Sequence, residues 1–339
     1  MKNNIIFISN SKGGIKTFED TFAQYTQKDK IRSIIINNTS YKKNEKDKIK
    51  HYKIDVLKRP LNTIKILKKI KNKKENFTFI FSNPIIFVIY FFYIKFFFNK
   101  KKIYFIVHSH LTKKKKSLYI VTLIGSFLFL FIDKIYYVSK FTKKWWSQMY
   151  FFPLFSKSSI QYNSINIPKN ITRKIGKKFR LGYVGRIDKE KGLDVFLDIA
   201  RNNKDNYEFN IFSEQKLRLN ICEKKYVKFF YKKSKPVIYN NIDLLLVTSP
   251  IENCPFSVLE AKSYGVPTLC IRTKGGINEI IRDNFDGIII SSEKKFINLK
   301  KSILTIKNNY KFFSKNSFKE AKKYDACIRI PKLIKEMIF

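Results

Sequence analysis

Residues 242–271, IDLLLVTSPIENCPFSVLEAKSYGVPTLCI, contain the pattern that decides the fold. The continuous apolar run at 242–249 is typical of a buried strand. A Pro-containing loop and a helix ended by Gly265 come next, and a second apolar run at 266–271 follows at once. A strand, a helix and a strand in this order predict a parallel βαβ unit.

The same alternation occupies both halves of the chain, and 339 residues are enough for two domains. We expect Rossmann-like domains at 1–165 and 166–317, followed by a C-terminal helix at 318–339 whose packing on the N-terminal domain is left open. Ligands of such doubly wound α/β domains bind at the carboxyl ends of the strands, so we expect a site in a cleft between the two domains. The other runs that predict strands lie at 4–10, 31–36, 77–82, 102–109, 134–139, 179–187, 207–213 and 286–291.

The composition is strongly basic, with 69 Lys and Arg against 26 Asp and Glu and a net charge of +43. Such a charge attracts polyanions or an anionic membrane surface, but compositional drift in an AT-rich genome explains it equally well. Arg is scarce relative to Lys, which argues against nucleic acid as a partner. The four cysteines form no C-x-x-C pair, so neither a disulfide framework nor a zinc site is expected.

Three segments bear on the cellular location. The apolar core near the N-terminus is too short for a signal peptide, which favours a cytoplasmic protein. The apolar segments at 84–98 and 118–132 fall short of the roughly 18–20 residues of a spanning helix. We expect buried helices there, or alternatively patches that dip into a membrane interface. The Lys clusters at 99–102 and 113–116 would suit such a surface-associated enzyme.

Two motifs of the second half suggest chemistry. In GRIDKEKG at 185–192, Arg186 and Lys191 lie in or beside a strand-to-helix loop, where cations and unpaired N–H groups make a diphosphate site. Glu252 and Glu260 are placed so that each can accept hydrogen bonds from the vicinal hydroxyls of a ribose or hexose. The alternatives are a solvated lysine-rich loop, a solvated Glu252 and an ordinary helical Glu260.

Taken together, VGRIDKEKG, ENCPFSVLEAKSYGVP and KGGINEII resemble the C-terminal half of the family 4 glycosyltransferases, in particular those of bacterial polysaccharide and lipopolysaccharide assembly. These enzymes have the GT-B fold, retain configuration and use nucleotide sugars. The resemblance implies that Arg186 and Lys191 bind the donor diphosphate and stabilise the charge on the leaving nucleotide. It also implies that no divalent metal is obligatory and that no other cofactor is needed.

The resemblance assigns further donor contacts in the same half. Glu252 would act in catalysis by contacting the transferred sugar, and Glu260 would bind the ribose. The backbone around Pro255, Phe256 and Ser257 would meet phosphate or sugar. The remaining matches are Gly275 and Gly276, which would let the chain approach the ligand closely, and Glu279, which follows this glycine turn.

The first half resembles the family less tightly. Gly13 and Gly14 would line the cleft, and FIVHSHLT at 105–112 matches a histidine motif at a strand end. There, His108 or His110 would act in catalysis through a hydrogen bond to the sugar or acceptor. Ser139, an N-cap candidate, would lie near the acceptor. The remaining histidine, His51, is expected to be structural, and 161–166 resembles an Asn-containing hinge.

Two departures from the family concern the donor. The segment IFSEQK at 211–216 replaces a Gly-x-Gly element, and NCPF at 253–256 replaces a more glycine-rich sequence. We therefore predict a retaining glycosyltransferase that moves a sugar from a nucleoside diphosphate sugar to a glycan or lipid-linked acceptor in cell-surface polysaccharide synthesis. Its attachment to the inner face of the cell membrane is left open. The alternatives are a non-catalytic basic protein that binds nucleic acid or anionic membrane, and a nucleotide-sugar epimerase of the same fold.

Overall fold

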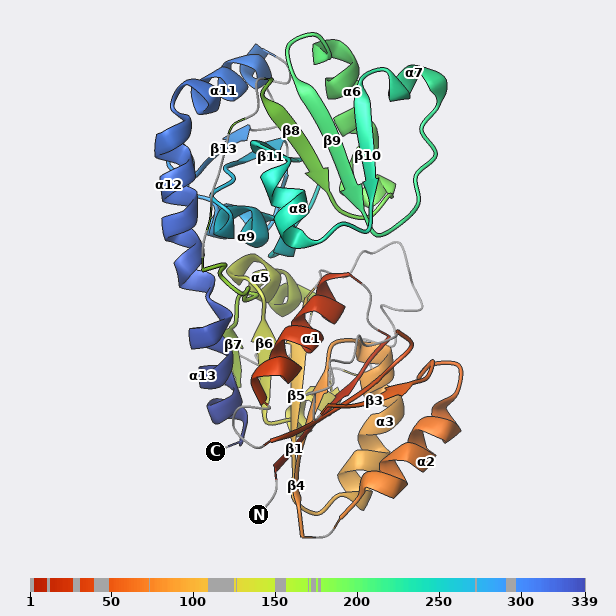
Figure 1. Ribbon diagram of the computed structural model, residues 1–339. Coiled ribbons are helices and arrows are strands. Elements are labelled where there is room, and N and C mark those ends of the chain that lie inside the picture. Colours follow the sequence, from red (N-terminus) through yellow and green to blue (C-terminus); the bar gives the residue numbers. More distant parts are fainter. Residues whose placement is uncertain are drawn as a thin grey trace. The chain divides into compact units, whose positions relative to one another are not determined.

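The computed structural model describes residues 3–10, 13–26, 31–39, 49–72, 74–108, 125, 127–149, 157–169, 171, 175, 178–271, 273–290 and 297–338. The chain divides into two compact units (Figure 1). The N-terminal unit comprises Met1–Tyr162 and Ala326–Phe339, and the C-terminal unit comprises Asn163–Asp325.

A parallel sheet in the order β3-β2-β1-β4-β5-β6-β7 forms the centre of the N-terminal unit. Its inner strands read as continuous apolar runs because helices cover both faces of a parallel sheet. The strands are β1 (Asn3–Ile8), β2 (Arg32–Asn37), β3 (Lys50–Lys53), β4 (Asn76–Phe81), β5 (Lys101–Val107), β6 (Lys134–Tyr137) and β7 (Ser158–Ile160). The helices include α1 (Gly14–Thr26), α2 (Pro60–Ile70), α3 (Pro84–Phe97), η2 (Phe129–Phe131), α5 (Lys140–Met149) and α13 (Ala326–Ile338).

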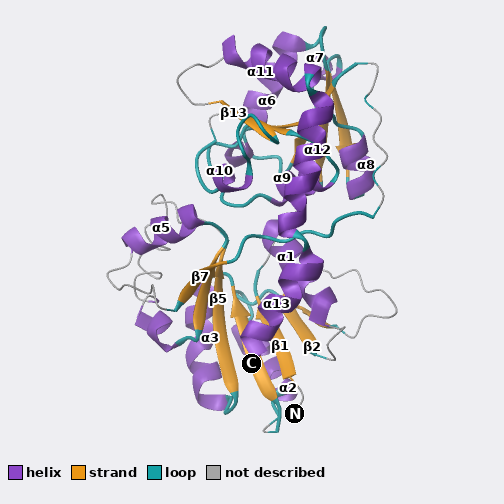
Figure 2. Cartoon of the chain, turned by 90° about the vertical axis from the view of Figure 1, so that its left-hand side faces the viewer, coloured by secondary structure: helices purple, strands orange, loops and turns teal. Residues whose placement is uncertain are grey.

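The last helix, α13, returns to the N-terminal unit and packs against α1 and β5 (Figure 2). Its C-terminal carbonyls accept hydrogen bonds from side chains of β5: the Tyr104 hydroxyl donates to the Met337 carbonyl at 3.0 Å, and Lys102 Nζ to the Ile338 carbonyl at 3.0 Å. Cations at a helix C-terminus also interact favourably with the helix dipole.

The C-terminal unit repeats the design with a parallel sheet in the order β10-β9-β8-β11-β12-β13. The strands are β8 (Arg180–Val184), β9 (Glu208–Ser213), β10 (Val227–Tyr231), β11 (Leu244–Val247), β12 (Thr268–Ile271) and β13 (Gly287–Ile290). The helices are η3 (Lys189–Lys191), α6 (Leu193–Asn203), α7 (Ile221–Lys224), α8 (Lys235–Asn240), α9 (Phe256–Ser263), α10 (Ile277–Ile280), α11 (Ile297–Asn308), α12 (Tyr310–Ala321) and η4 (Lys322–Tyr324). Both units thus confirm the expected pair of doubly wound α/β domains.

In each sheet the strand order reverses next to the first strand of the unit. β1 lies between β2 and β4, and β8 lies between β9 and β11. The loops that follow β1 and β8 therefore leave the sheet at a topological switch point, where open α/β sheets bind ligands.

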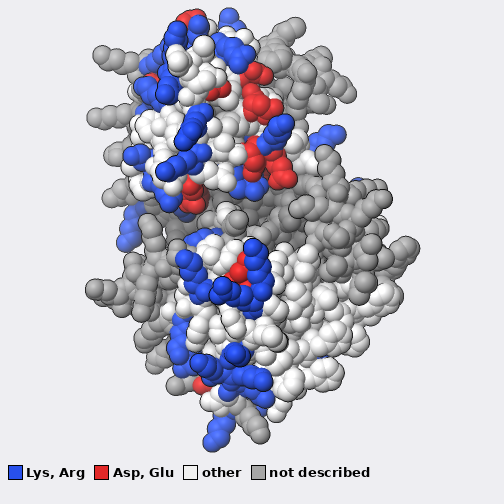
Figure 3. Space-filling view, turned by 90° about the vertical axis from the view of Figure 1, so that its right-hand side faces the viewer, with Lys and Arg blue, Asp and Glu red and all other residues white. Residues whose placement is uncertain are grey.

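The prediction of a buried helix at 84–98 is wrong on one side of that helix. α3 does form, but Ile89, Phe92, Phe96 and Phe97 are exposed, and so are Phe127, Leu130 and Phe131 in the second apolar segment. No helix within the described residues has the length and apolar character that crossing a membrane requires. On the face drawn in Figure 3, acidic side chains gather mainly on the C-terminal unit, whereas the N-terminal unit is lined by basic ones.

Candidate active site

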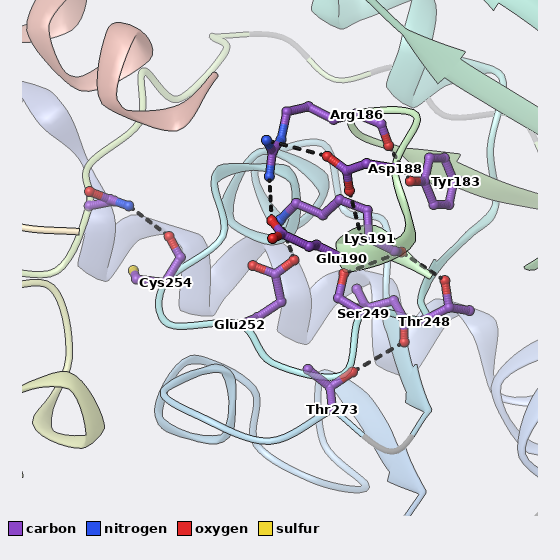
Figure 4. A network of polar contacts seen from close by, with 12 residues as sticks. Tyr183, Arg186, Asp188, Glu190, Lys191, Thr248, Ser249, Glu252, Cys254 and Thr273 are labelled. Atoms are coloured by element: carbon purple, nitrogen blue, oxygen red, sulfur yellow. Dashed lines mark hydrogen bonds and ion pairs between the residues drawn. The ribbon is translucent and has the colours of Figure 1, made fainter. Parts of the chain in front are cut away.

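Three loops of the C-terminal unit meet at one edge of its sheet. They follow β8, β11 and β12, which are adjacent and parallel, so their carboxyl ends point the same way. The loops after β8 and β11 come from the two strands at the switch point. They hold Arg186, Lys191 and Glu252 (Figure 4).

The loop after β8 is fixed by its own hydrogen bonds. Asp188 begins η3, and its Oδ1 accepts the Lys191 N–H at 2.9 Å. The Tyr183 hydroxyl donates to the Arg186 carbonyl at 2.5 Å. Gly192 has φ +65°, and a Cβ there would lie 2.2 Å from the Thr248 carbonyl oxygen, so only glycine allows the loop after β8 to pass this close to β11's end.

The result is a close ion pair between the two loops. Lys191 Nζ lies 2.5 Å from Glu252 Oε1, and Figure 4 shows the two side chains pointing toward each other. The Thr248 hydroxyl donates to the Gly192 carbonyl at 2.7 Å and thereby ties the loop after β11 to the loop after β8. Both charged groups are largely removed from water, which strengthens their attraction.

The backbone of Glu252 is held by the loop after β12. Its N–H donates to the Lys274 carbonyl at 2.9 Å, and its carbonyl accepts the Ile277 N–H at 3.2 Å. Gly275 has φ +112°, and a Cβ there would lie 2.3 Å from the Glu252 carbonyl oxygen. Gly275 was expected to let the chain approach the ligand, and in the structure its close contact is with the backbone of Glu252. Gly276 precedes α10 as its N-cap.

Arg186 lies at the surface of the same loop. Its guanidinium is 3.3 Å from Asp188 and 3.5 Å from Glu190, and about half of the side chain is exposed. Such exposed ion pairs are weak, so the Arg186 guanidinium can readily leave these two carboxylates and bind another anion.

Glu260 belongs to a separate cluster on α9. Its Oε1 lies 2.7 Å from Lys235 Nζ, and its Oε2 accepts a hydrogen bond from the Tyr239 hydroxyl at 2.9 Å. Burial, with the Glu260 charge nearby, raises the pKa of Tyr239 well above its ordinary value, so the hydroxyl stays a donor. The carboxylate is therefore oriented by one neutral donor and one cation.

The N-terminus of α9 opens onto the loop that holds Glu252. Pro255 is the N-cap, and its side chain offers no acceptor to the helix. The N–H groups of Phe256 and Ser257 are therefore directed to the region in front of the helix, which is a favourable place for an anion.

Asn163 supports this loop from outside the sheet. Its Nδ2 donates to the Cys254 carbonyl at 2.7 Å, and both residues are buried. Asn163 lies in the segment that resembles a hinge, so the chain entering the C-terminal unit is bonded to the loop between the two glutamates.

The residues singled out in the N-terminal unit follow its own strand ends. Gly13, with φ +57°, follows β1, and Gly14 begins α1. His108 follows β5 and packs edge-on against Phe18 with ring centroids 5.2 Å apart. Burial lowers the pKa of His108 to about 4, so the imidazole is neutral at physiological pH. Ser139 Oγ accepts the Thr142 N–H at 3.0 Å, which confirms it as the N-cap of α5.

Some of the other predicted residues make contacts within the fold, and others lie outside the described residues. The His51 ring is 2.9 Å from Asn37 Oδ1, as a structural histidine would be. His110 lies outside the described residues. The Glu279 N–H donates to the Gly276 carbonyl at 3.0 Å. Among the described residues, no group of three or more His, Cys, Asp or Glu side chains is arranged to hold a metal.

Sequence reasoning missed Thr248, Tyr183, Tyr239 and Lys235. Thr248 and Tyr183 act on backbone carbonyls, which no motif reveals. Lys235 is one of many lysines in the chain, so its contact with Glu260 had no signal of its own. Asp188 was recoverable, because an Asp three residues before Lys191 is the spacing of an N-cap.

Comparison with known proteins agrees with this arrangement. Residues 165–324 match the family model for glycosyl transferases group 1. An amylovoran biosynthesis glycosyltransferase, AmsD, of Erwinia amylovora is 27% identical over 124 residues, and an uncharacterized 41.2 kDa protein in the cps region of Klebsiella pneumoniae is 29% identical over 121 residues. Each match covers 34% of this chain and 34% of the relative, so it spans about a third of the length of these curated relatives.

Solved structures match over nearly the whole chain. Anabaena Alr3699/HepE in complex with UDP-glucose has a TM-score of 0.79 and 13% identity, with 99% of both chains covered. The apo form of the lipopolysaccharide outer core galactosyltransferase WaaB has a TM-score of 0.70 and 18% identity, with 100% of this chain and 99% of that chain covered. The resemblance found in the sequence is thereby confirmed: the fold is that of the GT-B glycosyltransferases, and residues 165–324 match the model of the glycosyl transferases group 1 family.

Proposed function

We propose that the protein is a retaining glycosyltransferase that transfers a hexose or acetamidohexose from a nucleoside diphosphate sugar to a glycan or lipid-linked glycan in cell-surface polysaccharide synthesis. The observation that supports this most directly is the contact between Lys191 and Glu252 at the switch point of the C-terminal sheet. A cation and a carboxylate side by side match a donor that presents a diphosphate next to sugar hydroxyls.

In this proposal the diphosphate takes over Lys191 as its partner. Phosphate oxygens would replace the Glu252 carboxylate at Nζ, and the exposed Arg186 would turn from Asp188 and Glu190 to the same anion. The N–H groups at the start of α9 would add to the positive potential. The two cations and this helix end would stabilise the negative charge of the departing nucleotide, which is the role a divalent metal has in other transferases.

Glu252, released from Lys191, would accept hydrogen bonds from the transferred sugar. Glu260 would bind the ribose hydroxyls, because Tyr239 and Lys235 already hold its carboxylate in one orientation. The neutral imidazole of His108 would hydrogen-bond the sugar or the acceptor without adding charge.

Retention would follow from attack on the face that the leaving group departs from. The bond between the anomeric carbon and the diphosphate oxygen breaks, and the acceptor hydroxyl oxygen bonds to the same face of that carbon. Its proton passes to the departing phosphate oxygen, so no covalent bond to the protein is formed. The stabilised diphosphate is then both leaving group and base.

Three similar proteins support the substrate class. The Anabaena structures are complexes with UDP and UDP-glucose, which supports a nucleoside diphosphate sugar as donor. The Erwinia relative is described as an amylovoran biosynthesis enzyme and the galactosyltransferase as an enzyme of the lipopolysaccharide outer core, which supports a cell-surface glycan as acceptor.

A thermal-shift series with UDP-, GDP-, ADP- and CMP-sugars tests the proposal. A donor at a hundred times its Kd stabilises the fold by about 2.7 kcal/mol, so the matching donor should raise the melting temperature by several degrees. Hydrolysis of that donor without acceptor, followed by mass spectrometry, should then release the free sugar. Absence of any shift at millimolar donor would contradict the proposal and favour a non-catalytic binding protein.

A further inference from the structure

The N-terminal unit exposes a continuous apolar edge, formed by Ile89, Phe92 and Phe96 of α3 and by Phe127, Leu130 and Phe131 at η2. The exposed fractions are 53% for Phe92, 75% for Phe96 and 57% for Phe131. Exposed apolar residues are ordinary when single, but a contiguous group on one face marks an interaction site.

The two parts of the apolar edge are in contact. The ring of the buried Phe91 lies 5.4 Å from Phe92 and 6.4 Å from Phe131, measured between centroids. Phe92 and Phe96 stack at 6.5 Å along the helix. The edge is therefore one surface and not two unrelated patches.

Packing inside the unit does not account for the apolar residues on the exposed side of α3. The opposite side of the helix, including Phe87, Tyr90 and Ile94, already fills the core under the sheet. A helix that is apolar all round is normally buried or lies in a membrane, whereas a surface helix has a polar outer face. At 14 residues α3 is too short to span a bilayer.

Lysines surround the apolar edge. Lys95 Nζ lies 5.9 Å from the centroid of Phe131, and Lys157 Nζ donates to the Leu130 carbonyl at 3.1 Å. A third lysine, Lys71, lies with its Nζ 5.6 Å from the centroid of Phe97, which is also exposed on α3. None of these three forms an ion pair with a carboxylate in the part of the chain that the structure describes.

An acidic side chain close in sequence to the edge is already occupied within the fold. Asp133, two residues beyond Phe131, accepts the Ile103 N–H at 2.7 Å. The edge thus combines aromatic rings with unneutralised cations, and Figure 3 shows basic side chains beside a broad uncharged area on this unit.

From this combination we infer that the apolar edge of α3 and η2 docks the protein on an anionic lipid surface. The charges decide between a membrane and a second copy of the chain. A symmetric contact between two copies would bring like-charged lysines together in a protein of net charge +43, whereas lipid phosphates complement them. The Phe rings would enter the boundary between headgroups and acyl chains, and the Lys side chains would extend to the phosphates.

The docking does not depend on sugar transfer, so it is tested without donor or acceptor. The full-length protein is sedimented with vesicles of phosphatidylcholine alone or mixed with phosphatidylglycerol. The triple variant Phe92→Gln, Phe96→Gln, Phe131→Gln should bind mixed vesicles at least about tenfold more weakly than the wild type. Lys95→Gln should weaken binding about fivefold and reduce its dependence on phosphatidylglycerol.

The matched control removes exposed apolar side chains elsewhere. Ile221→Gln with Ile328→Gln replaces residues that are 79% and 69% exposed on α7 and α13, and it should bind like the wild type. Equal binding by the triple variant and the wild type, or no wild-type binding to mixed vesicles, would overturn the inference. So would light scattering in which the wild type is a dimer and the triple variant a monomer. Circular dichroism of each variant verifies the fold, and a donor-induced thermal shift of the triple variant keeps the test separate from the proposed function.

Discussion

The two units share one architecture but differ in what they bury. Among the described residues, the charged residues that are buried in the C-terminal unit are Asp243, Glu252, Lys262, Asp286 and Glu320, and in the N-terminal unit Glu19. Each of the five in the C-terminal unit has an ion-pair partner. The core of the N-terminal unit is instead an aromatic cluster around Phe79, Phe87 and Phe105.

This difference indicates that the loops at the carboxyl ends of the strands have different roles in the two units. A buried charge is tolerated only when a partner holds it, so a unit rich in such pairs has loops of fixed geometry. That suits a site for a diphosphate, whose charge must be met at defined positions. The N-terminal unit offers neutral groups at its strand ends, such as His108 and the loop of Gly13, and besides its apolar core it has apolar side chains on its surface.

The largest expected effect concerns Lys262 and Asp286, which are both fully buried and 2.7 Å apart. Lys262→Met would leave the Asp286 carboxylate without its cation, and the free energy of unfolding should fall by about 3–5 kcal/mol in urea titrations. The double variant Lys262→Met, Asp286→Leu should recover part of that loss. Lys228→Met, which removes an exposed partner of Glu208, should cost less than about 1 kcal/mol. A loss that small for Lys262→Met would show that buried pairs do not determine the stability of this unit.

The next effect concerns catalysis. Lys191→Ala removes the cation beside Glu252, and donor turnover should fall by about 10²–10³-fold, because a lost transition-state contact of this kind costs that much. Lys189→Ala, a change of equal charge in the same turn η3, should retain turnover within about threefold, because surface charges add little. Lys191→Ala should melt below the wild type, because it leaves the buried Glu252 carboxylate without its cation, whereas Lys189→Ala should melt close to the wild-type temperature. Equal losses in the two variants would mean that general charge, and not the position of Lys191, matters.

Sequence patterns predicted the inner strands well and missed three of the four edge strands, β13 being the edge strand that was predicted. β1, β4 and β8 are buried on both faces and read as apolar runs. β3 and β7, at the two edges of the N-terminal sheet, and β10, at one edge of the C-terminal sheet, were not predicted. An edge strand faces solvent and pairs on one side, so its sequence keeps polar residues and loses the apolar signal.

The candidate site was predictable as a set of residues but not as a set of contacts. The motif around Arg186 and Lys191 and the pair Glu252 and Glu260 pointed to one edge of the sheet. Nothing in the spacing indicated that Lys191 would pair with Glu252 while Glu260 would pair with Lys235. Which partner a carboxylate takes depends on loop geometry, and here that geometry is set by backbone contacts at two glycines of positive φ, Gly192 and Gly275.

A smaller effect is expected in the N-terminal unit, where His108 is held neutral. Its pKa is about 4 in the folded protein against 6.5 as the ordinary value. Between these values the unfolded chain binds the proton more strongly, so stability is present above 6.5 and is lost as the pH falls toward 4. Between pH 7 and pH 5 the wild type should lose about 2 kcal/mol of unfolding free energy that His108→Gln does not lose. If the pH profiles of the two proteins ran parallel, His108 would be exposed to water in the folded protein and would not be held neutral by burial.

The smallest effect concerns the support of the donor loop by Asn163. Asn163→Ala removes the hydrogen bond that the buried Cys254 carbonyl accepts from Asn163, a contact worth about 1 kcal/mol. Because the bond positions the loop between Glu252 and the start of α9, the KM for donor should rise about fivefold while kcat changes less. Gln161→Ala, a nearby change in the same segment, should leave KM unaltered. An unchanged KM in Asn163→Ala, with only the melting temperature lowered, would show that the bond stabilises the fold without shaping the site. The fixed geometry of the C-terminal loops would then come from their ion pairs and glycine contacts alone.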